Sequence, residues 1–598
     1  MKYKILNSKK QISNKEGTVK IILENRGIKT KKEIEEFLNP KLSDVNVKSV
    51  GINRVALKKA IARIKKAIKN KEQIVVFGDY DVDGICGTAI LWETLYSLGA
   101  NVVPYIPHRI DQGYGLSQKG IENLKLKIEN CKLIITVDNG IVANKAVEFA
   151  GKQGIDVIIT DHHVPSKKLP KAYSIIHTTK LCGTGVAYLL AQEIKNQKSP
   201  PKADPPLEEK IKNAEDGHLE LVALATVADL VPLKGANRAL LKFGLEALRK
   251  TRRPGLLELL KEAGLEKQSI GVYEIGHMIA PRLNAMGRLE YAMDSLRVIC
   301  TNNPKRAADL ARLLGSTNRE RQELTLQTVL HATQAIREKK QEIRKLVFIA
   351  NESYEQGVIG LVAGKLVEEF YRPAIVVSIG EKYSKASARS ISGFNIIEFI
   401  REHSSYLMDA GGHPMAAGFT VETTKLVALQ KALEDRAELV LNKDLLIRSL
   451  KIDCELPLSA INVSLYESLQ KLVPFGMGNP EPTFLSKNVL VEDVRWVGAE
   501  GKHLKLRLAC HPEFISGSPA NRQASLRSNE MLKQVQHDKV LIFDGIAFGM
   551  GEMSSKIKIG DKIDIVYTID ENEWPARRSL GEGGNGEKRL QLKIKNFN

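Results

Sequence analysis

The amino-acid sequence predicts an α/β protein with a parallel sheet, a long connecting helix, a second α/β unit and a C-terminal β-barrel. Short apolar runs alternate with longer helical segments between residues 73 and 177, and again after residue 346. Continuous apolar strands separated by helices are typical of a parallel sheet that is covered on both faces. Alternating β-type runs fill the last hundred or so residues and favour a small barrel or sandwich.

Length and composition limit the class of protein. A chain of 598 residues is too long for one core and favours about three to five domains. Lys and Arg number 89 against 70 Asp and Glu, and this charge of +19 favours a polyanionic partner. Six cysteines without C-x-x-C spacing argue against a disulfide framework and a zinc module, and indicate a reduced, cytoplasmic setting. With no apolar leader and no bilayer-length apolar stretch, neither secretion nor membrane insertion is expected.

The elements of the first half follow in order. Residues 1–50 predict a helical lead-in that ends near Pro40. The first sheet is expected within residues 51–303, and its strands are predicted at 74–77, 102–106, 133–137, 156–160 and 174–177. Residues 219–233 predict a buried helix with Asp229 near its end, where a carboxylate is costly unless it is paired or bound to a metal.

The second half begins with residues 304–345, which have no strand signal and predict one long helix or a broken pair. A second α/β unit is expected at 346–447, and the barrel at 448–598. Two polar stretches without periodicity, near 510–539 and 575–589, predict mobile loop insertions in the barrel.

Acids and imidazoles follow three of the predicted strands directly. They are Asp79, Asp81 and Asp83 after the first run, Asp138 after the third, and Asp161, His162 and His163 after the fourth. In parallel sheets ligands bind beyond the carboxyl ends of the strands, so we expect these side chains to meet at one edge. Crowded carboxylates repel one another unless a cation holds them, and oxygen-rich ligation without sulfur suits Mg²⁺ or Mn²⁺. A solvated Asp turn or a lone calcium loop is the alternative for the first group alone.

Together with Asp229, such a cluster could hold two divalent cations ~3.5–4 Å apart, with Asp138 as the bridging carboxylate. A cation pair activates a shared water and neutralises a phosphoryl group, which favours phosphodiester hydrolysis. His163 could contact the scissile phosphate or the leaving group, and Asp161 could orient a neighbouring imidazole. The alternatives are a structural hydrogen bond for His163 and a satisfied helix-end carboxylate for Asp229.

A series of motifs resembles the RecJ branch of the DHH phosphoesterases. In chain order they are GDYDVDG, VDNG, TDHH, GTGVAYLL, ATVADLVPL, APRLNAMGRL and GGHPMAAGF. The resemblance extends from about Asn25 nearly to the C-terminus. It implies a DHH domain, a connecting helix, a DHHA1 domain and an OB-fold. It also implies a metal-dependent exonuclease that degrades single-stranded DNA from the 5′ end in recombination and repair, with Mn²⁺ or Mg²⁺ as cofactor. The partners implied are single-stranded DNA and a single-strand-binding protein or helicase, for a monomer without membrane contact.

The resemblance also implies roles for individual residues. The metal ligands are Asp79, Asp81, Asp83, Asp138, His162 and Asp229, and the catalytic candidates are His163 and Asp161. The DNA-binding residues are Arg109, Tyr114, Arg282, Asn284, Arg288, Ser387, Arg389, Ser390, Gly412 and His413. Arg109 could pair with a phosphate and Tyr114 could stack on a base, while the serines and Arg389 could clamp a terminal 5′ phosphate. For each arginine the alternative is a surface ion pair.

Two departures from the family pattern concern DNA binding. Tyr354, Glu355 and Gln356 stand where the family commonly has a Trp-His pair before GVIG. A carboxylate replaces that imidazole near the expected DNA track, so the sequence does not establish that DNA affinity is normal. The two insertions interrupt the presumed OB-fold, where DNA binding or processivity would suffer more than chemistry.

Two other functions stay open on the sequence. One is a DHH phosphodiesterase for very short oligonucleotides or cyclic dinucleotides, which the long C-terminal β region disfavours. The other is a catalytically silent nucleic-acid-binding or scaffold relative, which the intact acids and TDHH disfavour.

Overall fold

The computed structural model describes residues 2–7, 15–108, 113, 115–196, 217–338, 343–510, 541–571 and 589–598. It divides into two compact units, one of residues Pro40–Arg448 and one that combines Met1–Asn39 with Ser449–Asn598. Arg109, Tyr114 and most of both expected insertions lie outside the described residues. Among the described helices, none combines the length and apolar character needed to cross a membrane.

The first sheet of the larger unit is parallel, as predicted, with the strand order β3-β2-β4-β5-β6. Its strands are β2 (Gln73–Phe77), β3 (Val102–Tyr105), β4 (Cys131–Val137), β5 (Asp156–Asp161) and β6 (Ser174–His177). The helices around it are α3 (Arg54–Lys69), α4 (Val82–Ser97), α6 (Gln118–Lys127), α7 (Asn144–Lys152) and α8 (Gly183–Asn196).

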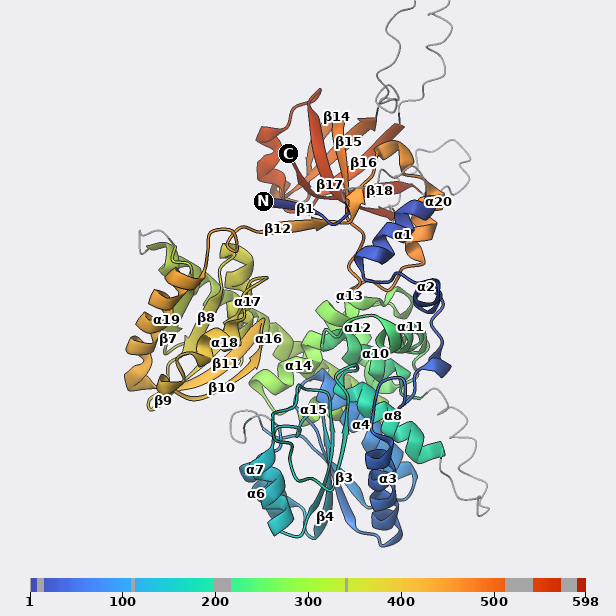
Figure 1. The fold of residues 1–598 in the computed structure, drawn as a ribbon, viewed down its shortest axis with the longest axis vertical. Coiled ribbons are helices and arrows are strands. Elements are labelled where there is room, and N and C mark those ends of the chain that lie inside the picture. Colours follow the sequence, from blue (N-terminus) through green and yellow to red (C-terminus); the bar gives the residue numbers. More distant parts are fainter. Residues whose placement is uncertain are drawn as a thin grey trace, which may run out of the picture. The chain divides into compact units, whose positions relative to one another are not determined.

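Two hydrophobic clusters cover this sheet, one on each face. In Figure 1, α6 and α7 lie on one side of the strands and α3 lies on the other. Ile74 and Ile135 pack with α3, α4 and α8, while their strand neighbours Val75 and Ile134 pack with α6 and α7. Since successive strand residues point to opposite faces, a strand covered on both sides must be apolar throughout. This is why the strands are continuous apolar runs in the sequence.

A helical layer follows the sheet. Its helices are α10 (Leu219–Ala228), α11 (Gly235–Arg249), α12 (Pro254–Glu262), α13 (Val272–Glu274), α14 (Ala280–Leu289) and α15 (Met293–Cys300). The predicted connection is a single helix, α16 (Pro304–Glu338), of 35 residues. It continues through Gly315, so the broken pair is not formed there.

The second α/β unit has a mixed sheet with the strand order β10-β11-β9-β8-β7. Its strands are β7 (Val347–Asn351), β8 (Ala374–Ser378), β9 (Tyr383–Arg389), β10 (Leu407–His413) and β11 (Ala416–Glu422). Only β7 and β8 pair in parallel within this sheet. Its helices are α17 (Ile359–Phe370), α18 (Ile396–Arg401) and α19 (Leu426–Val440).

The smaller unit contains a closed barrel, because β14 pairs with both β15 and β17 and the remaining strands complete the ring. The strands are β13 (Cys454–Glu455), β14 (Phe484–Val497), β15 (His503–Cys510), β16 (Leu541–Ala547), β17 (Lys562–Glu571) and β18 (Leu590–Phe597). Of the two architectures that the sequence left open, the structure therefore has the barrel.

The N-terminal segment belongs to the barrel's unit. Strand β1 (Lys2–Ile5) pairs in parallel with β12 (Ser449–Ile452), and α1 (Lys15–Asn25), which precedes α2 (Lys31–Leu38), packs on α20 (Val463–Gln470). Arg26 is buried, and its guanidinium lies 3.0 Å from Asp453 Oδ1 and 2.8 Å from Asn479 Oδ1. The expected lead-in of residues 1–50 is thus divided between the two units. The domain boundaries expected at residues 303, 345 and 447 stay predictions.

Candidate metal centre and anion pocket

The turn between β2 and α4 carries the first three acids. Asp81 caps α4, since its Oδ1 accepts hydrogen bonds from the amides of Asp83 (3.0 Å) and Gly84 (3.1 Å). A Cβ at residue 84 would lie 2.5 Å from the backbone nitrogen of Asp79, so the tight turn requires glycine there. Local capping and a close backbone approach therefore bring the acids together at one helix N-terminus.

Asp83 is anchored by the start of α8. Its two carboxylate oxygens accept hydrogen bonds from the amides of Gly183 and Thr184, both at 2.7 Å. A Cβ at residue 183 would lie 2.6 Å from the Cβ of Asp138, so glycine also permits the approach of this helix to the acids. Sequence reasoning assigned no role to these residues. The glycines of the GTGVAYLL motif were the available signal.

Asp138 follows β4 with φ 63°, a left-handed conformation that is uncommon outside glycine. Its amide donates to the carbonyl of Thr160 at 3.0 Å, which ties this turn to β5. Strained backbone held by its surroundings is concentrated at functional sites, because it aims a side chain that a relaxed turn would not aim. The turn holds the Asp138 carboxylate at the carboxyl edge of the sheet.

Asp161 organises the two histidines at the end of β5. Its Oδ1 accepts from the amides of His162 (2.7 Å) and His163 (3.1 Å) and lies 2.8 Å from His163 Nδ1. Its Oδ2 accepts from the amide of Ile141 at 2.9 Å. The carboxylate therefore orients the imidazole of His163, in the arrangement expected for Asp161.

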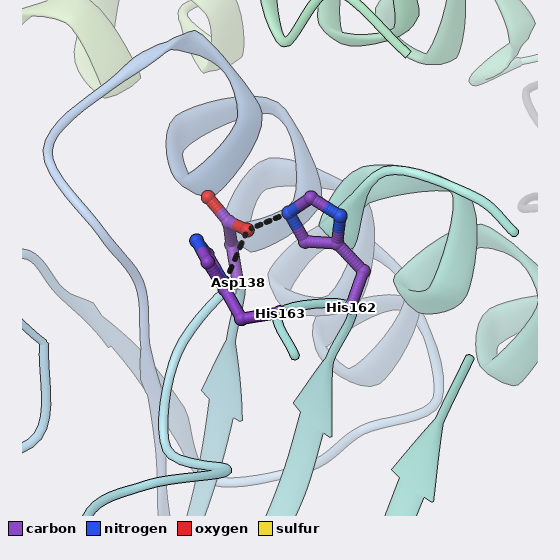
Figure 2. A group of neighbouring side chains, drawn as sticks. All are labelled: Asp138, His162 and His163. Atoms are coloured by element: carbon purple, nitrogen blue, oxygen red, sulfur yellow. Dashed lines mark ion pairs between the residues drawn. The ribbon is translucent and has the colours of Figure 1, made fainter. Parts of the chain in front are cut away.

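Asp138 lies between the two imidazoles (Figure 2). His162 Nε2 is 3.1 Å from Asp138 Oδ1, 3.7 Å from Asp83 Oδ2 and 3.6 Å from Asp229 Oδ2. Three groups have ligand atoms within 4.8 Å of one another: Asp138 with His162 and His163, Asp83 with His162 and Asp229, and Asp79 with Asp81 and Asp138. The structure thus brings together all eight residues of the predicted centre, and Asp138 belongs to two of the groups.

The electrostatics of this cluster are unfavourable without a cation. Burial raises the pKa of Asp138 well above its usual range, and the charges of Asp83 and Asp81 add to the effect. Burial and the same two charges raise the pKa of Asp229 to about 9. Burial also lowers the pKa of His162, which favours the neutral imidazole that ligates metals. For His163 burial acts in the same direction, but the hydrogen bond and charge of Asp161 outweigh it and raise the pKa.

These residues fit divalent cations. Asp138 Oδ1, His162 Nε2 and Asp229 Oδ2 are buried, and no described residue offers them a hydrogen bond. Buried acceptors of this kind are costly unless something satisfies them. Two oxygens and an imidazole nitrogen that face one another are a suitable donor set for Mn²⁺ or Mg²⁺.

A second feature is a cavity of about 460 Å³ beside β9 and the start of α17. Arg288, Ser387, Arg389 and Gly412, all singled out in the sequence, line it, and so does Gln356. Arg288 also donates to the carbonyl of Gly357 at 3.3 Å, which joins α14 to the loop before α17. Its lining contains two guanidinium groups and a hydroxyl beside one carboxylate, that of Asp409, and we call it the anion pocket. Tyr80 and Lys385 line it too, although sequence reasoning missed them.

The other predicted DNA-binding residues make different contacts. Arg282 forms an ion pair with Glu262 at 2.5 Å, and this pair is largely buried rather than at the surface as the alternative had it. Asn284 accepts from the amide of Val82 at the start of α4. Ser390 is buried and donates to the carbonyl of Phe394. The ring of His413 stacks near that of His163, with the centroids 6.1 Å apart.

Tyr354, at the position of the family's Trp, is buried at 2% exposure, and its hydroxyl lies 2.8 Å from His331 Nδ1 of α16. Its neighbour Glu355 is exposed, and Gln356 faces the anion pocket. The tyrosine therefore joins the connecting helix to the loop that shapes the pocket.

Comparison with known proteins agrees with this architecture. Family models match for the DHH family N-terminal domain (residues 73–226), the DHHA1 domain (343–439) and the RecJ OB domain (452–519 and 520–581). The single-stranded-DNA-specific exonuclease RecJ of Bacillus subtilis is 34% identical over 585 residues, which span 96% of this chain and 67% of that protein.

Solved structures of RecJ from Thermus thermophilus are also similar. The complex with Mn²⁺ has a TM-score of 0.75 and 28% identity, and the match covers 97% of this chain and 76% of that one. The complex with Mg²⁺ has a TM-score of 0.69 and 26% identity, over 97% and 74%. With the expected order of domains and the acids and imidazoles gathered at one sheet edge, this chain belongs to the RecJ family of DHH-domain proteins.

Proposed function

We infer that this chain is a metal-dependent exonuclease that hydrolyses phosphodiester bonds of single-stranded DNA in the 5′→3′ direction, in recombination and repair. The observation that carries the inference is the meeting of acids and imidazoles from three strand ends around Asp138. The names of the relatives supply the substrate, single-stranded DNA. The net charge of +19 supports a polyanionic substrate as well.

Two Mn²⁺ or Mg²⁺ ions are the proposed cofactors. The residues that would hold them are Asp79, Asp81, Asp83, Asp138, His162 and Asp229. When bound, such cations neutralise charge on the phosphoryl group and activate a water for attack. Asp138 is the proposed bridging ligand, because it is the carboxylate that belongs to two of the three ligand groups; His162 also belongs to two, but an imidazole nitrogen has one lone pair and cannot bridge two ions.

His163 is the proposed catalytic residue beside the ligands. Its Nδ1 is engaged by Asp161, and the raised pKa favours the imidazolium at neutral pH. An imidazolium can hold a phosphate oxygen or give a proton to the leaving oxygen through Nε2. Asp161 supports this role by fixing the ring and its tautomer.

The anion pocket is the proposed site of the terminal 5′ phosphate. Arg288, Ser387 and Arg389 line it, and the stacked rings of His413 and His163 connect its β-sheet to the metal centre. A pocket that accepts a terminal phosphate would select a free 5′ end and so account for exonucleolytic polarity. The roles of Arg109 and Tyr114 stay predictions, since both lie outside the described residues.

The cellular compartment of the protein is proposed from its cysteines. All six cysteines lie among the described residues and none is in a disulfide there, which supports a reducing, cytoplasmic compartment. A single-strand-binding protein or helicase as partner, and a monomeric state, stay predictions.

The decisive experiment is digestion of single strands labelled at either end, with Mn²⁺ and with chelator. We expect nucleotides to be released from the 5′ end only when the metal is present. Asp138→Asn should lower the rate by at least about a hundredfold, because it removes the carboxylate shared by two ligand groups. Asp44→Asn, the same change at an exposed residue, serves as the control.

Several results would contradict the proposal. They are release from the 3′ end, indifference to chelator, and faster turnover of a dinucleotide than of a long strand. The last would favour a phosphodiesterase for short oligonucleotides. Binding of DNA without hydrolysis would instead favour a silent relative.

A further inference from the structure

A buried cluster of charges lies outside the metal centre, around Arg253. Its guanidinium makes a two-pronged contact with Glu93, at 2.7 and 2.8 Å, and its Nε lies 2.7 Å from Glu220 Oε1. His218 Nε2 lies 2.9 Å from Glu93 Oε2. The four side chains are between 8% and 23% exposed. We call these four residues the Arg253 cluster.

The Arg253 cluster joins the two helices that bring acids to the metal centre. Glu93 lies in α4, ten residues after Asp83, and Glu220 lies in α10, nine residues before Asp229. At 1.5 Å per residue, each glutamate is about 14–15 Å along its helix from the acid. Because the ligand atoms of Asp83 and Asp229 lie within 4.8 Å of each other, the two helices meet at the metal centre. The Arg253 cluster ties them at their other ends.

Directional contacts fix the axial position of α10 more sharply than apolar packing does. Every residue from Leu219 to Val227 is buried, and the side chains are mostly Leu, Val and Ala. Hydrophobic contacts are non-directional, whereas hydrogen-bonded ion pairs hold only over a narrow range of positions. A slide of one residue rise, about 1.5 Å, would exceed the ~0.2 Å within which metal-ligand distances must hold.

The guanidinium is itself fixed in place. Arg253 caps α12 at the residue before Pro254, and its terminal nitrogens also donate to the carbonyls of Gly217 (3.0 Å) and Ile299 (3.4 Å). A planar fork held on several sides gives geometric specificity that a point charge lacks. Buried ion pairs add little net stability compared with apolar residues, and the best-attested reason for keeping one is register.

We propose that Arg253 is a positioning residue: by bridging Glu93 of α4 and Glu220 of α10, it sets the axial register of the two helices and so the separation of Asp83 and Asp229. The inference rests on the proposed function, because it concerns the same metal centre. Arg253 does not touch the reacting atoms. It acts through the two carboxylates.

Two variants test the role. Arg253→Lys keeps the charge but loses the fork. The triple change Arg253→Met, Glu93→Gln and Glu220→Gln keeps His218 but removes the guanidinium and both carboxylates together. None of these three charges is then left unpaired in the interior, which avoids the usual cause of misfolding.

Arg63→Lys is the matched control. Arg63 is also buried and joins two acids, Glu72 at 2.7 Å and Asp156 at 2.6 Å. Asp156 begins β5, at the edge of the sheet opposite the metal centre, and β5 is held by strand pairing on both sides. Loss of this fork should lower thermal stability without moving the metal ligands.

The measurement is Mn²⁺ binding to the metal-free full-length protein, followed by electron paramagnetic resonance, with thermal unfolding in parallel. We expect both Arg253 variants to bind Mn²⁺ about tenfold or more weakly, as for other residues that orient metal ligands, while Arg63→Lys keeps the wild-type affinity. In DNA hydrolysis kcat should fall and KM for the strand should stay near the wild-type value. Folded Arg253 variants with Mn²⁺ affinity within about twofold of wild type would overturn the inference. Failure of the wild-type protein to bind Mn²⁺ would instead overturn the proposed function and this inference with it.

Discussion

At the scale of single residues, the candidate centre depends on carboxylates that lie close together in the protein interior, where water does not screen their repulsion. Asp138 and Asp83 are 2% exposed, and Asp229 shares their surroundings. Burial penalises the charged form, and each neighbouring carboxylate penalises it further. The metal-free protein therefore stores an electrostatic cost that a cation removes, and this cost should be visible in the pH dependence of stability.

We predict that the metal-free protein loses stability as the pH rises. Folded Asp229 keeps its proton up to a pKa of about 9, while the unfolded chain releases it near the ordinary value of 3.8. Because the folded state holds this proton between those two pKa values and the unfolded state does not, the free energy of unfolding is highest below about pH 4. It falls toward pH 9 by at most about 1.4 kcal/mol per pH unit for this proton. Asp138 and Asp81 act in the same direction.

Urea unfolding in chelator at a series of pH values measures this slope. Asp229→Asn should flatten it, because the amide has no proton to lose, and Asp44→Asn should leave it unchanged. Added Mn²⁺ should stabilise the protein most at high pH, since metal binding requires deprotonated carboxylates. Equal slopes for wild type and Asp229→Asn would refute the explanation.

At the scale of elements, the anion pocket depends on how closely the loop before α17 approaches the end of α14. A Cβ at Gly357 would lie 2.3 Å from the carbonyl oxygen of Arg288. That carbonyl belongs to the end of α14, and both residues line the pocket. A backbone atom cannot turn aside as a flexible side chain can, so only glycine permits this contact.

We predict that Gly357→Ala moves the loop before α17 away from α14 and weakens the binding of a 5′ phosphate in the anion pocket. The expected results are a loss of about 1–3 kcal/mol of unfolding free energy, as for other overpacked sites, and a raised KM for strands with a 5′ phosphate. Thermal unfolding and steady-state kinetics measure the two effects. Gly364→Ala, seven residues later and inside α17, is the control, because a Cβ there would meet nothing within 4 Å. It should stabilise the helix by about 0.5–1 kcal/mol and leave KM unchanged. If the two variants have the same unfolding free energy and the same KM, the close contact between Gly357 and Arg288 does not shape the pocket.

At the scale of the whole molecule, the barrel's unit is assembled from both ends of the chain. Asn25 and Arg26 contact Asp453, more than four hundred residues away in sequence. The larger unit, Pro40–Arg448, contains the metal centre and the anion pocket. Residues 1–39 and 449–598 therefore depend on each other for their folded structure, whereas residues 40–448 form a separate unit.

We predict that residues 40–448 fold alone and keep Mn²⁺-dependent hydrolysis, with a raised KM for long strands because the barrel's unit is missing. Residues 40–598 should be less stable, since removal of Arg26 leaves Asp453 buried without its ion-pair partner, at a cost of about 3–5 kcal/mol. Soluble yield, thermal unfolding and hydrolysis of strands of different length test this. A stable 40–598 fragment together with an unfolded 40–448 fragment would contradict it.

The sequence by itself determined the parallel sheet and the set of residues at its edge. Strands that are covered on both faces must be apolar throughout, and the carboxyl ends of parallel strands meet at one edge, so the positions of Asp79, Asp138 and His162 followed from local pattern. The long helix α16 and the barrel strands are periodic over their own length and could be predicted for the same reason.

Only the tertiary structure decided which distant residues meet. Local pattern contains no information on the joining of residues 1–39 to the barrel, on the ion pair between Arg282 and Glu262, or on the bridge of Arg253 between two helices. Each of these is a contact between different helices or segments, and its energy comes from burial and hydrogen bonding that exist only once the chain has packed.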